Sequence, residues 1–154
     1  MAPQGGRPAE TGSRSGGRSE FMTSEEGTAL IRAMFEAFCD LDRPVEEIAA
    51  YFAPGYVQRV DGREFGREGF LDHLRALRTT LRRLDFVIEQ IVCDGASAAS
   101  VHVAHALKRT GEAVRVKVIA FYKLEHGQIS LVDELTRLVH GDASDRDLAF
   151  VRHA

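Results

Sequence analysis

The sequence predicts an α+β fold in which three helices come first and an antiparallel sheet follows. Apolar residues recur at helical spacing up to about residue 84, and beyond that point they alternate with polar ones. Short connections that carry Gly95, Gly111 and Gly127 divide the alternating part, and such connections suit hairpin turns. We therefore expect the helices to cover one face of a curved antiparallel sheet of roughly four to six strands.

The size and charge of the chain narrow the classes of protein to which it can belong. Its 154 residues suffice for one domain with its own core. A net charge of -3 gives no basic excess with which to neutralise phosphates, so we expect no nucleic-acid partner. No apolar run approaches the roughly 20 residues that cross a bilayer, so we expect no membrane partner either.

The start of the chain and its cysteines indicate where the protein works. Residues 1–22 are rich in Gly, Ser, Arg and Pro, and we interpret them as a natural flexible tail, a start upstream of Met22, or a remnant of cloning. They lack the apolar centre of a secretory signal, and Cys39 and Cys93 have neither CxxC nor metal-ligand spacing. Two free thiols in the cytoplasm are the simplest interpretation, and a single disulfide is the alternative.

The domain is expected to cover residues 23–140, with a C-terminal tail at 141–154. Its first helix begins at Thr23, which has capping-box spacing to Glu26. A shorter helix begins near Pro44, whose missing N–H is tolerated in a first turn. A third helix begins at about residue 67. Its apolar stripe consists of Phe70, Leu74, Leu77, Leu81 and Leu84.

The expected strands follow from composition and from the turns between them. An early strand at 56–60 stops at Asp61-Gly62. The four strands of the meander are expected at 86–93, 100–109, 113–124 and 128–138. If Thr110-Gly111 and His126-Gly127 are two-residue turns, counting back from each turn gives the pairing of the strands.

This pairing predicts which side chains face the helices. The covered face carries mainly Val, Ile and Leu, and its central polar residues are His105, Tyr122 and Asp133. A slip of one residue would turn every side chain of a strand to the other face. A bulge of one residue would likewise give the place of Asp133 to Glu134.

Three stretches make the chain resemble the NTF2-like superfamily, in particular its SnoaL-like branch. They are YFAPGYVQRV, REFGREGFLDHLRAL and EHGQISLVDELTRL, and the matching order of elements covers residues 24–139. The resemblance implies a cone, in which a curved sheet wraps helices around a deep apolar pocket, and homodimers that form through the sheet. The superfamily includes ketosteroid isomerase-like, polyketide cyclase-like, dehydratase and epoxide hydrolase enzymes, as well as non-catalytic binding modules, so the fold does not fix the function.

The catalytic side chains of isomerase-like members are missing at the matching positions. Those members carry a carboxylate base near the first strand, a carboxylic acid on the third meander strand and a tyrosine on the first helix. Here the first position falls on Gln58 or Arg59 and the second on Ala120, while the first helix offers Phe35 and Phe38. The steroid-isomerase mechanism is therefore not expected.

Asp133 and His105 are the candidate catalytic residues. A carboxylate on an apolar face resists ionisation, so the pKa of Asp133 would rise toward that of a useful base, and its expected neighbour Ala120 would leave room for a ligand. His105 could act as an acid, a base or a donor to a substrate oxygen. The structural alternatives are an aspartate bonded at the rim and a satisfied core histidine. The expected register separates the two by more than about 10 Å, so they form no dyad.

Further side chains are candidates for ligand binding besides Ala120. Tyr122 and Tyr51 could point hydroxyl groups into the pocket, and His73 could border it from the third helix. Arg59 would bind an acidic ligand if it faced inward. The alternatives are tyrosines held by one backbone partner, a histidine on the helix flank and an exposed arginine.

No metal or cofactor is expected. His102 and His105 stand three apart on a strand, so they point to opposite faces and cannot share a metal.

We expect a small, largely apolar molecule as ligand, with cofactor-free acid/base chemistry of cyclase, isomerase or dehydratase type as the possible reaction. The rival hypothesis is a non-catalytic module whose cone is filled by its own side chains and whose sheet serves association.

Overall fold

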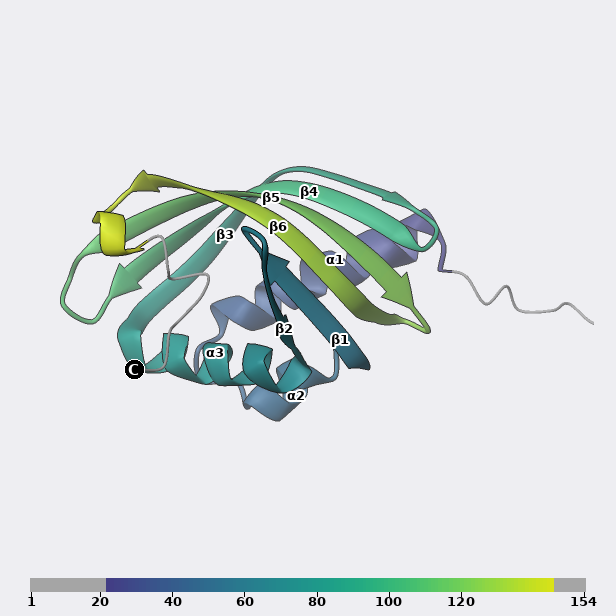
Figure 1. Cartoon of the computed structure of the whole chain (residues 1–154), viewed down its shortest axis with the longest axis horizontal. Helices are drawn as coiled ribbons and strands as arrows, with labels where there is room; N and C mark the ends of the chain where they lie inside the picture. The colour runs from purple at the N-terminus through teal and green to yellow at the C-terminus, as the bar shows by residue number, and fades with distance from the viewer. Residues whose placement is uncertain (1–21, 146–154) are drawn as a thin grey trace, which may run out of the picture.

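The computed structural model of the chain describes residues 22–145 and confirms the predicted α+β cone (Figure 1). Most of the predicted N-terminal tail and the end of the predicted C-terminal tail lie outside this range. The elements are, in chain order, α1 (Ser24–Cys39), α2 (Val45–Ala49), β1 (Phe52–Val60), β2 (Arg63–Gly66), α3 (Arg67–Thr80), β3 (Leu81–Asp94), β4 (Ser97–Lys108), β5 (Ala113–Glu125) and β6 (Gln128–His140).

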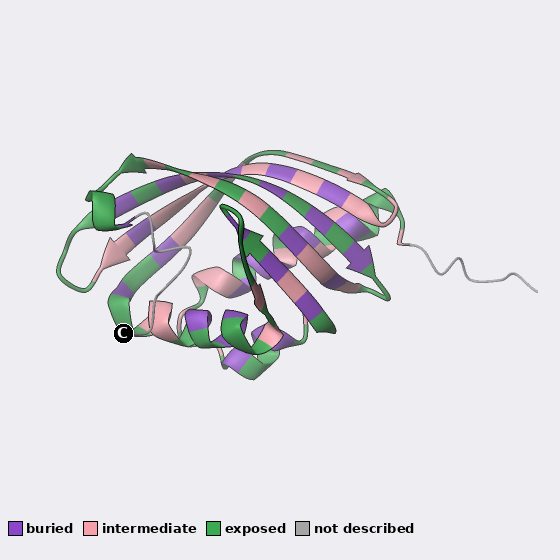
Figure 2. Cartoon of the chain, in the orientation of Figure 1, coloured by how far each residue is buried: buried purple, intermediate pink, exposed green. Residues whose placement is uncertain are grey.

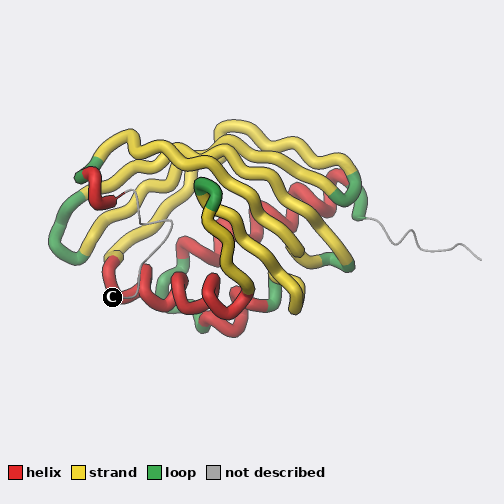
Figure 3. The backbone as a smooth tube through the Cα atoms, in the orientation of Figure 1, coloured by secondary structure: helices red, strands yellow, loops and turns green. Residues whose placement is uncertain are grey.

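A single curved sheet of six strands, in the order β2-β1-β6-β5-β4-β3, arches over the three helices (Figure 3). All neighbouring strands are antiparallel except β1 and β6, which run parallel. Buried and exposed residues alternate along the strands because one face of the sheet packs on the helices and the other faces outward (Figure 2). Within residues 22–145 no helix has the length and apolar character that crossing a membrane requires.

Local sequence explains how the first two helices begin. The hydroxyl of Thr23 accepts a hydrogen bond from the backbone N–H of Glu26, which confirms the predicted N-cap of α1. Pro44 precedes the first residue of α2, where its missing N–H leaves no intrahelical bond unmade. Met22, which we assigned to the N-terminal tail, packs against the core.

The predicted end of the third helix is wrong. α3 ends at Thr80, and Leu81 and Leu84 belong to β3. A register shift between Leu81 and Arg83 places an extra residue in β3, so two leucines three apart both lie on the buried face of a strand. The bulge therefore imitates helical spacing in the sequence. The early strand is also longer than predicted, and β2 was not expected at all.

The predicted pairing of β4 with β5 is wrong by one residue. The backbone N–H of Lys108 bonds the carbonyl oxygen of Glu112, so the connecting loop has three residues, 109–111, rather than two. Gly111 takes a φ of 94° within it, as three-residue hairpin loops require. The slip turns β4 over. Its buried face carries Ala98, Ser100, His102 and Ala106.

The predicted pairing of β5 with β6 holds at the turn and then fails at a bulge. Glu125 pairs with Gln128 as predicted, but Lys123 pairs with Leu131, so Ser130 is the extra residue. The Ser130 hydroxyl donates to the carbonyl oxygen of Lys123 at 3.3 Å. Beyond this bulge the parity of β6 is reversed, and Ala120 pairs with Glu134 rather than with Asp133.

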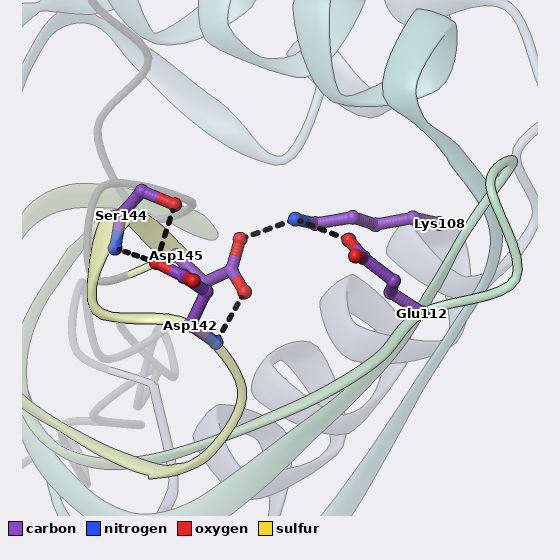
Figure 4. A network of polar contacts seen from close by, with 5 residues as sticks. All are labelled: Lys108, Glu112, Asp142, Ser144 and Asp145. Atoms are coloured by element: carbon purple, nitrogen blue, oxygen red, sulfur yellow. Dashed lines mark hydrogen bonds and ion pairs between the residues drawn. The ribbon is translucent and has the colours of Figure 1, made fainter.

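The first residues of the predicted C-terminal tail form a turn that packs against β4 (Figure 4). Asp145 is buried, and its carboxylate forms an ion pair with the ammonium group of Lys108, which also lies 3.3 Å from Glu112. The second oxygen of Asp145 accepts from the backbone N–H of Asp142 at 2.8 Å. The side chain of Asp142 in turn accepts from Ser144, and this contact lowers the pKa of the Asp142 carboxyl.

Candidate functional site

A cavity of about 140 Å³ lies between the helices and the concave face of the sheet. At about 30 Å³ for each water molecule, that volume would hold roughly five of them. The wall is built by α1, α3 and the inner faces of five strands, and the helices contribute Met34, Phe35, Phe38, His73, Leu74 and Leu77. Most of the lining is apolar. The polar side chains that line it are Tyr56, Gln58, His73, His102, Tyr122 and Glu134.

Glu134 is held by a side chain from the neighbouring parallel strand. The Nε2 group of Gln58 donates to Oε1 of Glu134 at 2.6 Å, and the hydroxyl of Tyr56 donates to Oε1 of Gln58 at 3.1 Å. In this orientation the amide nitrogen of Gln58 faces the carboxylate, which accepts when it is ionised, and the amide oxygen faces the phenol, which donates. The side-chain amide of Gln58 therefore points from β1 toward the carboxylate on β6.

The surroundings of Glu134 disfavour its ionised form. The pKa of the carboxyl is raised to about 7, mainly by the loss of water around it and also by the nearby charges of Asp61 and Asp133, while the Gln58 hydrogen bond opposes the rise. Glu134 is still partly accessible, and it lines the cavity. A carboxyl that changes its charge near neutral pH can both take and return a proton.

A second polar chain crosses from β5 to β4. The hydroxyl oxygen of Ser100 lies 2.8 Å from the hydroxyl oxygen of Tyr122 and 3.0 Å from Nδ1 of His102. The His102 ring packs against Phe35 with ring centroids 4.6 Å apart. Burial raises the pKa of Tyr122 above its usual range and lowers that of His102 to about 4. Both end groups are therefore neutral at neutral pH.

Two of the predicted ligand-binding residues line the cavity. Tyr122 faces it from β5, and His73 faces it from α3. His73 is buried, and that burial lowers its pKa to about 4, so its ring is neutral at neutral pH. The sequence left two positions open for His73, the pocket border and the flank of the helix, and favoured the flank; in the structure His73 lies in the cavity wall.

The predicted inward orientation of Asp133 is wrong, because the bulge at Ser130 turns it outward. Asp133 is exposed and pairs across the sheet with Arg59, whose guanidinium lies 4.0 Å from its carboxylate. Arg59 also contacts Glu64 at 2.9 Å, and this hydrogen bond raises its pKa. Both residues thus belong to an ion-pair cluster on the outer face, away from the cavity.

Three other predicted residues also lie away from the cavity. His105 is on the outer face, opposite Arg115, because β4 is turned over relative to the prediction. Tyr51 precedes β1 and contributes its carbonyl oxygen to Ile129 rather than a hydroxyl to the cavity wall. Ala120 faces inward but is buried, since Tyr122 reaches past it to Ser100 on the neighbouring strand. Its small size makes room for a tyrosine ring, not for a ligand.

Sequence reasoning missed the partners that matter most in the cavity. The sequence did not predict the polar roles of Ser100 and Tyr56 or the inward direction of His102. It offered Glu134 only as the alternative to Asp133. One signal was available in β4. Every second residue from Ala98 to Ala106 is small except His102, so His102 is the one large side chain on that face of the strand. The larger valines of β4 lie on the other face.

The described part of the chain holds no cluster of His, Cys, Asp and Glu side chains suited to a metal ion. Cys39 and Cys93 are both free thiols in the structure. Burial raises the pKa of each, so neither is activated as a thiolate.

Comparison with known proteins places this geometry among related chains. A family model described as a SnoaL-like domain matches residues 31–132. A protein of Schizosaccharomyces pombe, described as uncharacterised, is 47% identical over 129 residues, which are 84% of this chain and 99% of that protein.

Solved structures agree with the fold at much lower identity. An NTF2-like protein of unknown function from Exiguobacterium is 12% identical, with a TM-score of 0.63 over 70% of this chain and 98% of its own. An epoxide hydrolase of M. tuberculosis, of the LEH-like type, is 17% identical, with a TM-score of 0.65 over 74% of this chain and 84% of its own. These likenesses show the NTF2-like cone.

Proposed function

The chain belongs to the SnoaL-like domain family, and we propose that it binds a small, largely apolar carbonyl compound in its cone, where Glu134 acts as the base in a cofactor-free reaction. The observation that carries the proposal is a single carboxylate, held by Gln58, in a mostly apolar cavity whose other polar side chains are uncharged. Buried carboxyls with raised pKa values cluster at functional sites, because a base works best when its pKa lies near the working pH.

The chemistry follows from what the groups around the cavity can do. Glu134 takes a proton from a carbon next to a carbonyl group, and the electrons of that C–H bond move into the new C–C double bond as the carbonyl oxygen becomes negative. Neutral donors on Tyr122 or His102 stabilise that oxygen through a hydrogen bond. Return of the proton at another carbon is an isomerisation. Attack of the carbon on a second carbonyl, whose oxygen then takes the proton from Glu134, is a cyclisation. Departure of a neighbouring hydroxyl group, which takes the proton from Glu134 and leaves as water, is a dehydration.

The rival function, a binding or dimerisation module with a filled cone, receives less support. A cone filled by its own side chains would leave no cavity beside Glu134, and such a cavity is present. A carboxyl with a raised pKa also costs stability whenever it is ionised, and a purely structural wall would be more stable with an apolar side chain there.

The test uses 2-tetralone, a small apolar ketone with acidic C–H groups. Binding of the ketone is expected to raise the Tm of the protein. The protein is also expected to accelerate the exchange of the ketone's α-hydrogens for deuterium in D₂O, which is followed by NMR. Glu134→Gln is expected to lower that acceleration by about 100-fold or more while ketone binding persists. Asp133→Asn, the neighbour on the outer face, is expected to change it less than about twofold.

Two outcomes would contradict the proposal. One is equal exchange rates for the wild type and Glu134→Gln. The other is a wild type that neither binds nor exchanges any member of a panel of small cyclic ketones, with 2-tetralone as its first member.

We further propose that a second copy of the chain covers the outer face of the sheet. Ile119, Phe121 and Leu135 are 56%, 41% and 66% exposed and lie together in the middle of that face, since Ile119 and Leu135 pair across β5 and β6. Clustered large apolar side chains on a monomer surface mark interaction sites. The cluster is bordered by positive Lys117 and negative Asp133, so two copies related by a twofold axis could match opposite charges.

A further inference from the structure

The Tyr122–Ser100–His102 chain has both ends in the cavity and its middle buried behind the wall. Tyr122 and His102 line the cavity, whereas Ser100 is only 2% exposed and does not line it. The two ends are thus two hydrogen bonds apart through a residue that a ligand does not reach. This arrangement differs from that of two independent polar groups on a wall.

The number of protons allows only two arrangements, called orders below, of the hydrogen bonds that join Tyr122, Ser100 and His102. Ser100 has one hydroxyl proton, so it donates either to Nδ1 of His102 or to the oxygen of Tyr122. In the first order Tyr122 donates to Ser100, and the histidine carries its proton on Nε2. In the second order the histidine donates from Nδ1 to Ser100, and Ser100 donates to Tyr122. The phenol keeps its proton, which is then free to form a hydrogen bond with a ligand. Each order leaves one end able to donate and the other able to accept.

From this geometry we infer that Tyr122, Ser100 and His102 form a neutral relay that moves a proton between two oxygen atoms of one bound ligand. The inference rests on the proposed function, because it assumes that the cavity holds a small oxygen-bearing molecule. The ligand class it implies is an apolar compound with an enol group conjugated to a carbonyl group, because the electrons of the broken O–H bond then move through the double bonds to the carbonyl oxygen. Glu134 moves a proton from carbon, and the relay moves one between oxygens.

The transfer balances without any co-reactant. A ligand O–H bond breaks as its proton bonds to Nε2 of His102, and the Nδ1 proton passes to the Ser100 oxygen. The proton of Ser100 passes to the Tyr122 oxygen, and the phenol proton of Tyr122 forms a new O–H bond on the ligand's carbonyl oxygen. Every side chain ends with the number of protons it had at the start. A second ligand bound in the opposite orientation, with its O–H group at Tyr122 and its carbonyl oxygen at Nε2 of His102, sends the protons back and resets the chain.

The burial of the chain favours this neutral shuttle over a charged intermediate. An imidazolium or a phenolate would be costly in a site that raises the pKa of Tyr122 and lowers that of His102. Phe35 and Phe86, whose rings lie 4.6 Å and 6.0 Å from the His102 ring, keep water from that side. A concerted passage of protons avoids both charges.

The test reads the tautomer of His102 directly, without any ligand. In protein labelled with ¹⁵N-histidine, the ring nitrogen shifts give the fraction of His102 that carries its proton on Nε2, and His102→Gln assigns the signals. We expect both tautomers to be populated in the wild type at pH 7. Tyr122→Phe removes the acceptor at the far end, so Ser100 turns to Nδ1 and the Nε2–H fraction rises.

The decisive comparison is a double-mutant cycle through Ser100. In Ser100→Ala, Tyr122→Phe is expected to leave the tautomer ratio unchanged, and Ser100→Thr, which keeps the hydroxyl, should retain the coupling if the alanine variant does not fold. Ser97→Ala, on the same strand but on the outer face, serves as the matched control. A His102 locked in one tautomer in the wild type, or an equal effect of Tyr122→Phe with and without the Ser100 hydroxyl, would overturn the relay.

These results separate the relay from the proposed function. Ketone exchange that depends on Glu134, together with a locked His102, would refute the relay alone. A coupled tautomer ratio without ketone binding or exchange would refute the proposed reaction and leave the relay in place.

Discussion

Gln58 and Glu134 join the two parallel strands of an otherwise antiparallel sheet through a hydrogen bond of 2.6 Å between Nε2 and Oε1. The parallel pairing of β1 with β6 brings these side chains together on the inner face, one from each strand. The contact is the main feature that stabilises the ionised form of Glu134, against burial and two nearby acidic groups.

Glu134→Gln is therefore expected to stabilise the protein at alkaline pH. The folded-state pKa of about 7 is above the usual value of about 4.3, so the favourable contribution of protonated Glu134 is full below pH 4.5 and is lost as pH rises through 7. A raised pKa of this size corresponds to a loss on the order of 3 kcal/mol. Chemical denaturation at pH 4 and pH 8 should show the variant to be more stable only at pH 8. A variant that is destabilised at pH 8 would contradict this electrostatic account.

His73 and His102 are expected to make the folded protein less stable as pH falls, which is opposite to the effect of Glu134 in much the same pH range. Burial lowers the pKa of each to about 4 from about 6.5, so their contribution is full above pH 6.5 and is lost as pH falls through 4. Each corresponds to on the order of 3 kcal/mol, so the two together outweigh Glu134 and the protein should lose stability on acidification. His73→Gln should flatten the acid limb of stability against pH measured by urea unfolding. His105→Gln, on the outer face, should keep the acid limb of the wild type, and the same flattening in both variants would contradict the assignment.

Gly27→Ala is expected to destabilise the domain even though alanine favours helices. A Cβ at residue 27 would collide with the sulfur of Cys93 and lie 2.9 Å from Cδ1 of Leu124. Overpacking of this kind costs about 1–3 kcal/mol, which exceeds the gain of up to about 1 kcal/mol in helix propensity. The Tm should fall, and Cys93→Ala should recover part of the loss. Gly55→Ala, where a Cβ meets nothing within 4 Å, is the control. A higher Tm for Gly27→Ala would show that α1 can shift away from the sheet.

The outer-face proposal predicts that single charges dissociate a dimer. Leu135→Arg and Ile119→Lys place a charge in the centre of the apolar cluster and should convert the protein to monomers in analytical ultracentrifugation, with an unchanged circular dichroism spectrum. Lys123→Ala, an exposed substitution on the same face toward the end of β5, should leave the dimer intact. A wild type that sediments as a monomer at high micromolar concentration would refute the proposal.

The fold could be predicted largely from the sequence because it depends on periodicity and turn chemistry. The change from helical to alternating spacing and the glycines of the hairpins were sufficient for an α+β fold with helices on one face of the sheet, and the resemblance to the NTF2-like superfamily added the cone. The inner face could not be predicted, because three irregularities each alter the count by one residue. The bulge near Arg82, the loop at 109–111 and the bulge at Ser130 are settled by packing and by local hydrogen bonds, which a count along the chain does not contain.

The site followed the same rule. Tyr122 was placed on the inner face correctly because β5 keeps its parity, whereas the helical spacing of α3 left His73 between the pocket and the helix flank. Asp133 and His105 were placed on the wrong face because each lies beyond one of the irregular connections. The choice between Asp133 and Glu134 depended on one serine.

The ¹³C titration of the Glu134 carboxyl, assigned with Glu134→Gln, tests the account most directly. We predict a midpoint near pH 7, which shifts when 2-tetralone binds in the cavity. A midpoint near the ordinary value of about 4.3, unaffected by the ketone, would show that Glu134 is solvated and would contradict its role as the base of the cone.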